Sequence, residues 1–402
     1  MDEKTPFRIE QLRLETGERY VLTVGSDGMP VWWPNLFCTV CILLPGRGYS
    51  TMQAKMAAIR DFHNLCGRLG IDIDARIESL ELFPEAEIVA LREELRPRNS
   101  EARGSGSADV RGKAGKNGHW KSRLIAVRDY IVWRANQVID RLPLRDPGLP
   151  EARRRIEALP KRLVGGLKVH SNTSEEGMDE KTERAFLDAI TPGHPTNPFR
   201  KRNQYRNQAL WLLYYAGLRR SAPLVLTGRH LHLNDDKPYV FVPRTQDDPE
   251  DPREEEPRNK TLAHDVSLTP ETAATLHRFV VHHRPTYPNA RKSKFVFFSQ
   301  EGKPLSIGSV VFMYKQLRAK VPGLAKDFTT HMVRRTNKDR MGDAAEELGW
   351  DSDVEESVTN QQSGWTRSSK TRLTYQRRRL RQKANDLSLK MQDIATKGRA
   401  DG

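Results

Sequence analysis

The segment NQALWLLYYAGLRR, residues 207 to 220, restricts the fold more than any other part of the chain. Its apolar side chains lie around most of the helical circumference, which is typical of a helix surrounded by protein on all sides. Strand-like runs and further helical patterns follow it. This part of the chain therefore belongs to the core of a domain that combines helices with a few strands.

The charge balance indicates a polyanionic partner. The chain of 402 residues carries 67 Lys and Arg against 52 Asp and Glu, a formal net charge of +15. Such an excess favours nucleic acid as a partner, although charge alone does not identify it. The length allows two or three domains, and a hydrophobic content of 37% with seven Trp is typical of folded chain.

Neither the N-terminus nor the apolar runs indicate a membrane. The N-terminus lacks a basic segment followed by an apolar core, and the longest apolar run, LFCTVCILL, is too short to span a bilayer. We therefore expect a cytoplasmic protein in contact with DNA or RNA. Cys38, Cys41 and Cys66 are too few for a disulfide framework or a complete zinc site, so we expect them to be structural.

The first half of the chain is predicted to be mainly helical. Residues 19 to 34 predict a β-hairpin around Ser26-Asp27-Gly28, with the following tryptophans buried. Helical spacing then predicts helices over 50 to 70, with Ser50 or Thr51 as cap, over 80 to 95 and over 119 to 139. Between the last two, the Gly- and Ser-rich residues 99 to 118 predict a mobile loop.

The second half shows two strand patterns, at 238 to 245 and 261 to 268, and a third at 294 to 299. A helix is predicted to begin at Thr269-Pro270, because proline is tolerated at the first helical position. The loop between the first two strands holds seven carboxylates from Asp247 to Glu256. We interpret it as a solvated loop pointing away from DNA; a partner site or an autoinhibitory DNA mimic is the alternative.

Four short motifs follow one another in this half of the chain. They are Arg219 after Gly-Leu in YYAGLRRSAPLVLT, the H-x-x-R spacing of His331 and Arg334 in HMVRRT, the dipeptide Gly364-Trp365, and Tyr375 ten residues further on. Each motif alone is weak in so basic a chain. Their order and spacing together resemble the tyrosine recombinase (phage integrase) family, over about residues 46 to 383.

The resemblance implies a multidomain, mainly α fold. An N-terminal all-helical core-binding (SAM-like) domain would precede an α+β tyrosine-recombinase catalytic domain with a small antiparallel sheet. We expect the parts to be a β-hairpin segment (1–45), a helical DNA-binding domain (46–165), a linker (166–182), the catalytic domain (183–384) and a C-terminal helix or tail (385–402). The first segment either contacts accessory sites or caps the helical domain.

The chemistry of phosphodiester cleavage suits these residues. The nonbridging oxygens must be neutralised, and guanidinium forks such as those of Arg219 and Arg334 bind two oxygens and stay charged. A tyrosine has a pKa near 10, so about one molecule in a thousand is phenolate at pH 7. The two arginines and Arg372 would favour the phenolate of Tyr375, and His331 can accept its proton or bind the phosphate. Most cations from 377 to 383 lie better placed for the DNA backbone.

Other roles come from the resemblance alone. It implies that a lysine on the hairpin between the first two motifs protonates the leaving 5′ oxygen, and Lys260 is the only lysine in residues 238 to 291. Arg244 or Arg258 could take that position, but arginine is a poor proton donor. The resemblance also implies that Trp365 offers its indole N–H to the phosphate, that a 3′-phosphotyrosine forms, and that no metal or other cofactor is needed.

Two residues depart from the family pattern. Ala222 stands where the family has an acidic residue after the first arginine, so support for Arg219 must come from elsewhere or be weaker. Trp350 is a second candidate for the tryptophan position, although it lies 25 residues before Tyr375; we favour Trp365.

The C-terminal tail carries a narrow apolar stripe. Its members, spaced by three or four residues, are Leu380, Ala384, Leu387, Met391 and Ile394. The stripe either packs on its own domain or, by the resemblance, docks on a neighbouring protomer.

These features predict a site-specific recombinase for integration, excision or transposition of a mobile element. Double-stranded DNA, a homo-oligomer from dimer to tetramer on DNA and accessory recombination proteins are the partners the resemblance implies, at the nucleoid and with no membrane. Two rival hypotheses are a type IB topoisomerase-like enzyme and a catalytically inactive DNA-binding regulator with the same fold.

Overall fold

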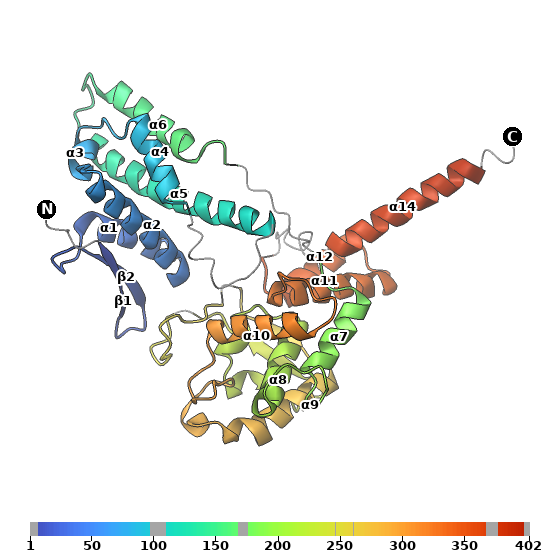
Figure 1. The fold of residues 1–402 in the computed structure, drawn as a ribbon. Coiled ribbons are helices and arrows are strands. Elements are labelled where there is room, and N and C mark those ends of the chain that lie inside the picture. The colour runs from blue at the N-terminus through green and yellow to red at the C-terminus, as the bar shows by residue number, and fades with distance from the viewer. Residues whose placement is uncertain are drawn as a thin grey trace. The chain divides into compact units, whose positions relative to one another are not determined.

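The fold was analysed in a computed structural model, which describes residues 7–96, 110–167, 176–245, 247–259, 261–366 and 377–397. The chain divides into two compact units, Met1–Thr173 and Ser174–Gly402. Both units are mainly helical and each contains one small antiparallel sheet (Figure 1). The expected fold class, a multidomain and mainly α protein, is therefore confirmed.

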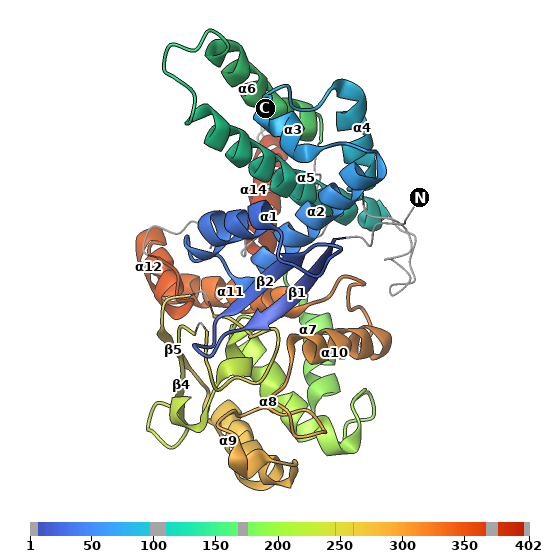
Figure 2. The same ribbon diagram turned by 90° about the vertical axis from the view of Figure 1, so that its left-hand side faces the viewer.

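The first unit packs a two-stranded sheet and several helices around one core. Its elements are β1 (Arg8–Arg13), β2 (Arg19–Val24), α1 (Trp32–Phe37), a π-helical turn (Cys38–Leu43), α2 (Tyr49–Arg68), α3 (Ile73–Glu78), α4 (Glu85–Glu94), α5 (Val110–Ile139) and α6 (Leu149–Val164). Helix α5 runs through the middle and contacts α2, α3 and α6. The hairpin β1–β2 packs on α2, as Figure 2 shows.

Apolar residues that recur at helical spacing in the sequence of this unit are buried in its core. On α2, Met52, Met56, Ile59 and Phe62 are buried, and so are Leu124, Val127, Tyr130 and Ile131 on α5. Two cysteine thiols, Cys38 and Cys66, are buried in the same core, and burial raises the pKa of each to about 12. These thiols are therefore inert packing groups rather than nucleophiles.

The predicted hairpin over 19 to 34 is wrong in its second strand. The turn at Gly25 to Gly28 forms, but only the isolated bridge Val24↔Pro30 follows it, and α1 then begins. Pro30 has no N–H for a ladder. The side-chain amide of Asn35 takes the place of a strand, because it accepts from Thr23 N and donates to Thr23 O, both at 2.8 Å.

The predicted burial of the two tryptophans is wrong for Trp32 and holds only in part for Trp33, which is half-buried. Trp33 packs edge-on against Trp133, with ring centroids 6.2 Å apart, and the guanidinium of Arg134 lies 4.3 Å from its ring. Trp32 is 69% exposed. The ring of Trp33 is therefore partly buried against the core, whereas Trp32 faces solvent.

Three helix boundaries differ from the expectations. Helix α2 begins at Tyr49 with Gly48 as N-cap, so neither Ser50 nor Thr51 caps it. The helix expected from residue 80 begins at Glu85, because Pro84 disfavours helical backbone in the residue before it. Helix α5 already begins at Val110 within the expected loop 99 to 118; residues 97–109 lie outside the described part.

The second unit holds a core of its own and a three-stranded sheet of order β3-β4-β5. Its described α-helices and strands are α7 (Glu180–Ile190), α8 (Gln204–Tyr215), β3 (Leu231–His232), β4 (Tyr239–Val242), β5 (His264–Ser267), α9 (Pro270–Arg278), α10 (Ile307–Lys320), α11 (Thr330–Glu347), α12 (Ser352–Gln362) and α14 (Arg377–Lys397). Short 3-10 and π-helical turns connect them, at Lys201–Asn203, Ala222–Val225, Gly228–His230, Phe279–His283, Arg284–Thr286 and Ala290–Lys292.

Helix α8 lies at the centre of this core, as its sequence predicts. Trp211 has no exposed surface, stands edge-on to Phe186 at 5.6 Å and stacks on Phe328 at 5.7 Å between ring centroids. Thr269 caps α9 by accepting from Thr272 N, with Pro270 at the first helical position.

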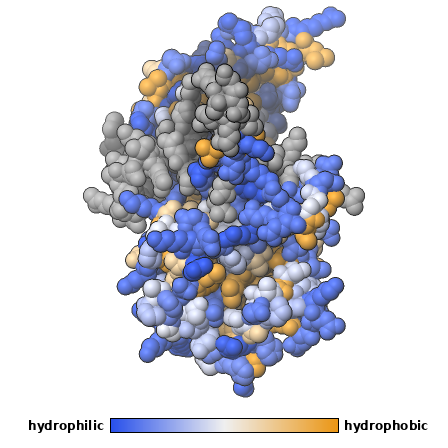
Figure 3. All heavy atoms as spheres, turned by 90° about the vertical axis from the view of Figure 1, so that its right-hand side faces the viewer, coloured by the Kyte–Doolittle hydropathy of each residue, from blue (hydrophilic) through white to orange (hydrophobic). Residues whose placement is uncertain are grey.

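Hydrophilic residues dominate the face drawn in Figure 3, where apolar residues form scattered patches. Among the described residues, no helix is long and apolar enough to cross a membrane.

The expected strand over 294 to 299 is wrong as a sheet member. It makes only isolated bridges, Thr227↔Phe295 and Phe298↔Pro304, although its aromatic residues are buried. Pro304 lacks the N–H that would extend the pairing. The segment is therefore a buried connection between helices rather than a strand of the sheet.

The acidic loop is only partly a solvated loop, which corrects our interpretation. Asp251 is 1% exposed and pairs with Arg253, N to O 2.6 Å, while both oxygens of Glu256 accept from the backbone at Asp247 and Asp248. Lys294 binds Asp248 at 2.8 Å. These carboxylates are fixed inside the unit because nearby cations and N–H groups satisfy them; Glu254 and Glu255 remain exposed.

Candidate active site

Arg219 is placed by the way α8 ends. Gly217 has φ +100°, and Leu218 N donates to Leu213 O at 3.1 Å, the bond that closes a helix through a left-handed residue. The chain then turns, and Nη1 of Arg219 donates to Ser363 O at 3.4 Å. With Ala222 in place of an acidic residue, a backbone carbonyl at the end of α12 thus supports this guanidinium.

His331 and Arg334 lie in the first turns of α11. Thr329 caps the helix and accepts from His331 N at 3.2 Å. Three residues apart, the two side chains share one side of the helix. Arg334 is 2% exposed, and its Nη1 donates to Gly217 O. This hydrogen bond connects the N-terminal part of α11 to the turn after α8 that carries Arg219.

Trp365 is placed by the end of α12. Gly364 has φ +60°, Trp365 N donates to Asn360 O at 2.9 Å, and Gly364 O accepts from Leu262 N at 3.0 Å. The indole is 7% exposed. Its ring centroid lies 5.3 Å from Cζ of Arg334 and 5.9 Å from Cζ of Arg219, which are cation–π distances.

Two further residues of this cluster were missed by the sequence analysis. His264 of β5 lies beside Gly364 and donates from Nδ1 to Leu262 O at 2.8 Å. Lys338 of α11 is 1% exposed, and its Nζ lies 6.0 Å from the Trp365 ring centroid. Lys338 could have been found from the sequence, since it follows Arg334 by one helical turn and therefore lies on the same side of the helix. No local sequence pattern indicates that His264 belongs to the cluster.

The cluster carries a strongly positive field. Desolvation lowers the pKa of His331, and the charges of Arg335, Arg220, Arg334 and Arg219 lower it further. Desolvation is also the main cause that lowers the pKa of His264; its bond to Leu262 opposes the shift, and Arg334, Arg219 and Lys338 add to it. Both rings are therefore biased toward the neutral form, in which imidazole can accept a proton.

A cleft of about 590 Å³ opens beside the cluster. Its lining residues are Arg219, Ser221, Arg244, Arg258, Thr261, Leu262, Gly364, Trp365 and Thr366. Arg258 pairs with Asp247, and its backbone O accepts from Ser221 Oγ at 2.7 Å. The wall of this cleft is therefore rich in guanidinium groups, which suits an anionic ligand.

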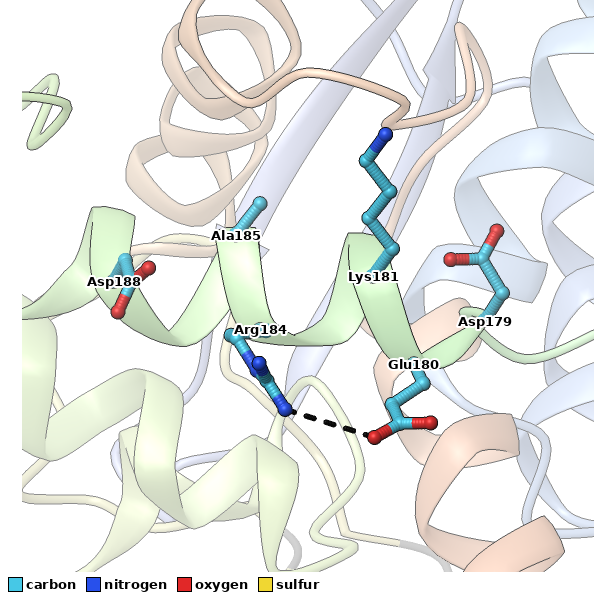
Figure 4. Close-up of a pocket in the computed structure, with 6 residues that line it drawn as sticks. All are labelled: Asp179, Glu180, Lys181, Arg184, Ala185 and Asp188. Carbon is cyan, nitrogen blue, oxygen red and sulfur yellow. Dashed lines mark ion pairs between the residues drawn. The ribbon is translucent and has the colours of Figure 1, made fainter.

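A second hollow lies along α7 (Figure 4). The residues drawn there come from one helix, and Arg184 and Glu180 pair with each other at 3.6 Å. Asp179 is used as the N-cap of α7.

Within the described residues no group of three or more His, Cys, Asp or Glu could hold a metal ion.

Of the remaining predicted residues, only Trp350 lies within the described part of the chain. Lys260 and Tyr375 lie outside the described residues, as does Arg372. Trp350 is 41% exposed and follows the end of α11, whereas Trp365 contacts both arginines.

Several cations of the basic run have protein partners, which corrects their assignment to the DNA backbone. Arg379 pairs with Glu346 at 2.9 Å and with Glu355 at 3.1 Å, Lys383 pairs with Glu346 at 2.7 Å, and Arg381 pairs with Glu176 at 2.9 Å. Arg379 and Lys383 anchor the first turns of α14 because carboxylates of α11 and α12 lie within reach.

Two arginines that meet at one indole, beside a small antiparallel sheet, define a site for an anion. The model of the phage integrase family matches residues 177–379, half of the chain. The chain therefore belongs to this family of DNA breaking-and-rejoining enzymes.

Three solved structures are similar to this chain. XerH site-specific recombinase bound to palindromic difH substrate is 16% identical, with 83% of this chain and 78% of that chain covered and a TM-score of 0.46. The Tn1549 transposon integrase in complex with transposon right end DNA is 16% identical, with 70% and 93% covered and a TM-score of 0.39. XerA recombinase is 14% identical, with 86% and 93% covered and a TM-score of 0.36. No curated protein matches the chain.

Proposed function

We propose that this chain is a site-specific tyrosine recombinase that cuts and rejoins double-stranded DNA through a 3′-phosphotyrosine intermediate. The observation that carries the proposal is the convergence of Arg219 and Arg334 on the ring of Trp365, at 5.9 and 5.3 Å. Two guanidinium forks held in this way can bind the nonbridging oxygens of one phosphodiester. That charge neutralisation is what cleavage of the anionic ester requires.

The proposed reaction exchanges one phosphoester bond for another. The phenolic oxygen of Tyr375 attacks phosphorus, the bond to the 5′ oxygen breaks, and Lys260 gives that oxygen a proton. His331 accepts the phenolic proton or hydrogen-bonds the phosphate, and the indole N–H of Trp365 faces the phosphate. Rejoining is the reverse attack by a 5′-hydroxyl, so no nucleotide cofactor enters the balance.

DNA is the proposed partner, and the structures of XerH and the Tn1549 integrase are complexes with DNA. In this proposal the first unit clamps the duplex and the second cuts it. The chain would act at the nucleoid as a dimer to tetramer, with accessory recombination proteins, in the integration, excision or transposition of a mobile element.

Assembly of the oligomer is proposed to use the end of α14. Leu387 and Met391 of the apolar stripe are 61% and 63% exposed, so these two side chains do not pack on their own unit. The side chains of Leu380 and Ile394 lie outside the described residues. Docking of the stripe on a neighbouring protomer predicts that removal of residues 385–402 abolishes synapsis while single-site cleavage persists; intact synapsis would contradict it.

The deciding experiment traps the covalent intermediate. Nicked duplexes made from DNA that flanks the gene are incubated with the protein, and adducts are separated on denaturing gels. Wild type is expected to form an adduct that Tyr375→Phe and Arg334→Gln abolish. Trp350→Phe is the matched control for Trp365→Phe, because only Trp365 contacts the arginines.

The same gels separate the rival functions. Sequence-specific binding without any adduct would favour the inactive regulator. Adducts on arbitrary DNA, with relaxation of any supercoiled plasmid, would favour a type IB topoisomerase-like enzyme.

A further inference from the structure

Lys338 is a buried lysine that the proposed reaction does not use. It lies on α11 one helical turn after Arg334 and is 1% exposed. Its Nζ donates to Met341 Sδ at 3.1 Å and lies 6.0 Å from the centroid of the Trp365 ring. Lysine is seldom found so deeply buried, because its ammonium group loses its hydration.

Two guanidinium groups, an imidazole and an indole near Lys338 come from four parts of the unit. Arg334 precedes it on α11, Arg219 comes from the turn after α8, His264 comes from β5, and Trp365 follows α12. The one indole thus lies within 6.0 Å of three cationic side chains, Arg219, Arg334 and Lys338. Two of these three are arginines, which stay charged at any pH that the protein meets.

Burial lowers the pKa of Lys338 well below its usual value, and the charges of Arg334 and Arg219 lower it further. Relative to an exposed lysine, the neutral amine is therefore favoured while the cleft is empty. An anion held between the two guanidinium groups would reverse the electrostatic part of this effect, since it cancels the charge that repels the ammonium form.

We propose that Lys338 is a third, proton-regulated cation of the phosphate site, which takes up a proton from solvent when a phosphodiester binds Arg219 and Arg334. This proposal rests on the proposed function, because it takes the arginine pair as the phosphate site. Lys338 acts through Arg334 and the indole, so it is a positioning residue. An arginine at this position would keep its charge in the empty site, whereas the charge of a lysine with a lowered pKa can change when an anion binds.

Proton uptake on binding is the direct test. Binding of a nicked duplex is measured by calorimetry at pH 8 in two buffers with different enthalpies of ionisation, and the difference gives the number of protons taken up. Tyr375→Phe is the parent protein, since it binds without cutting. We expect uptake in the parent, and a loss of about one proton when Lys338→Met is added.

Two further variants assign the protons. His264→Gln, added to the parent, measures the contribution of the neighbouring imidazole. Lys338→Arg is expected to abolish the uptake of the Lys338 proton as Lys338→Met does, because arginine is charged before and after binding.

Two results would overturn the proposal about Lys338. Equal uptake by the parent and Lys338→Met overturns the proposal. A parent that takes up no proton overturns it too, and that result does not depend on the folding of any Lys338 variant. Either outcome leaves the proposed function intact as long as wild type still forms its adduct. Failure of wild type to bind DNA or form an adduct would instead reject the proposed function.

Discussion

A β-carbon on Gly364 would lie 2.4 Å from Nδ1 of His264, so the glycine at the end of α12 and the histidine of β5 share a space that admits no further atom. The same glycine has φ +60° and accepts from Leu262 N at 3.0 Å. This contact fixes the end of α12 against the strand, and Trp365 follows as the next residue. The position of the indole at the arginine pair is therefore set by a glycine that does no chemistry.

Gly364→Ala is expected to displace Trp365. The substitution adds about 1–2 kcal/mol of backbone strain in the left-handed region, and the methyl group would collide with the imidazole. We expect adduct formation to fall by about a hundredfold, as for a misplacement near 1 Å. Gly349→Ala is the matched control, because Gly349 has φ +66° with nothing within 4 Å. Equal adduct formation by the two variants would refute the role of the contact.

The acidic loop is expected to be part of the stable fold rather than an inhibitor of DNA binding. Arg253→Met would remove the guanidinium that pairs with the buried Asp251, and breaking such a pair lowers the free energy of unfolding by about 3–5 kcal/mol. Chemical denaturation measures this loss. Glu254→Gln with Glu255→Gln removes only exposed carboxylates, so stability should be unchanged; a marked gain in DNA affinity would revive the inhibitory hypothesis.

Adduct formation is expected to depend on the protonation of His331. The pKa of this ring lies below the usual value because of desolvation and the neighbouring arginines, so the neutral form predominates at pH 7. A ring that accepts the phenolic proton must be neutral, and activity should therefore fall as the pH drops through this lowered pKa. Rates from pH 5 to 8 measure the profile. His331→Gln should flatten its acidic limb, and an unchanged limb would exclude His331 as the acceptor.

The start of α14 is expected to detach when Arg379 is replaced. This side chain is 11% exposed and pairs with Asp343 at 3.5 Å, Glu346 at 2.9 Å and Glu355 at 3.1 Å. Arg379→Gln leaves those carboxylates without their shared cation, so amide hydrogens in the first turns of α14 should exchange faster. Arg381→Gln is the control, since that side chain is 63% exposed and pairs with Glu176 rather than with α11 or α12. Similar exchange in both variants would show that the cluster does not anchor the helix.

Lys338→Met is expected to stabilise the DNA-free protein. The folded protein holds the pKa of Lys338 well below that of the unfolded chain, so the unfolded state binds more protons in the pH range between the two values. Stability of wild type should therefore rise with pH across that range, and the advantage of Lys338→Met should shrink as the pH approaches 10. Thermal unfolding from pH 7 to 10 measures both. A constant difference across this range would contradict the burial of an ionisable amine.

The sequence predicted what depends on short stretches of chain. The buried helix within 207 to 220 and the cap at Thr269 follow from local periodicity and turn chemistry; the structure forms this helix as Gln204–Tyr215 and places the cap as expected. Local patterns failed where a distant side chain replaced a backbone partner, as Asn35 does for the expected strand after Pro30. They also failed to predict the partners of the acidic loop, because Arg253 also donates to carbonyls of Leu224 and Leu305, up to 52 residues away.

By itself the sequence determined the family and the order of Arg219, His331, Arg334 and Trp365, because motif residues and the glycines that end helices are local properties. Only the tertiary structure decided which tryptophan meets the arginines, and that Lys338 lies buried beside them. It also decided that a carbonyl of Ser363 supports Arg219, across 144 residues of sequence. Charge compensation and burial depend on which distant elements pack together, and no local pattern encodes that.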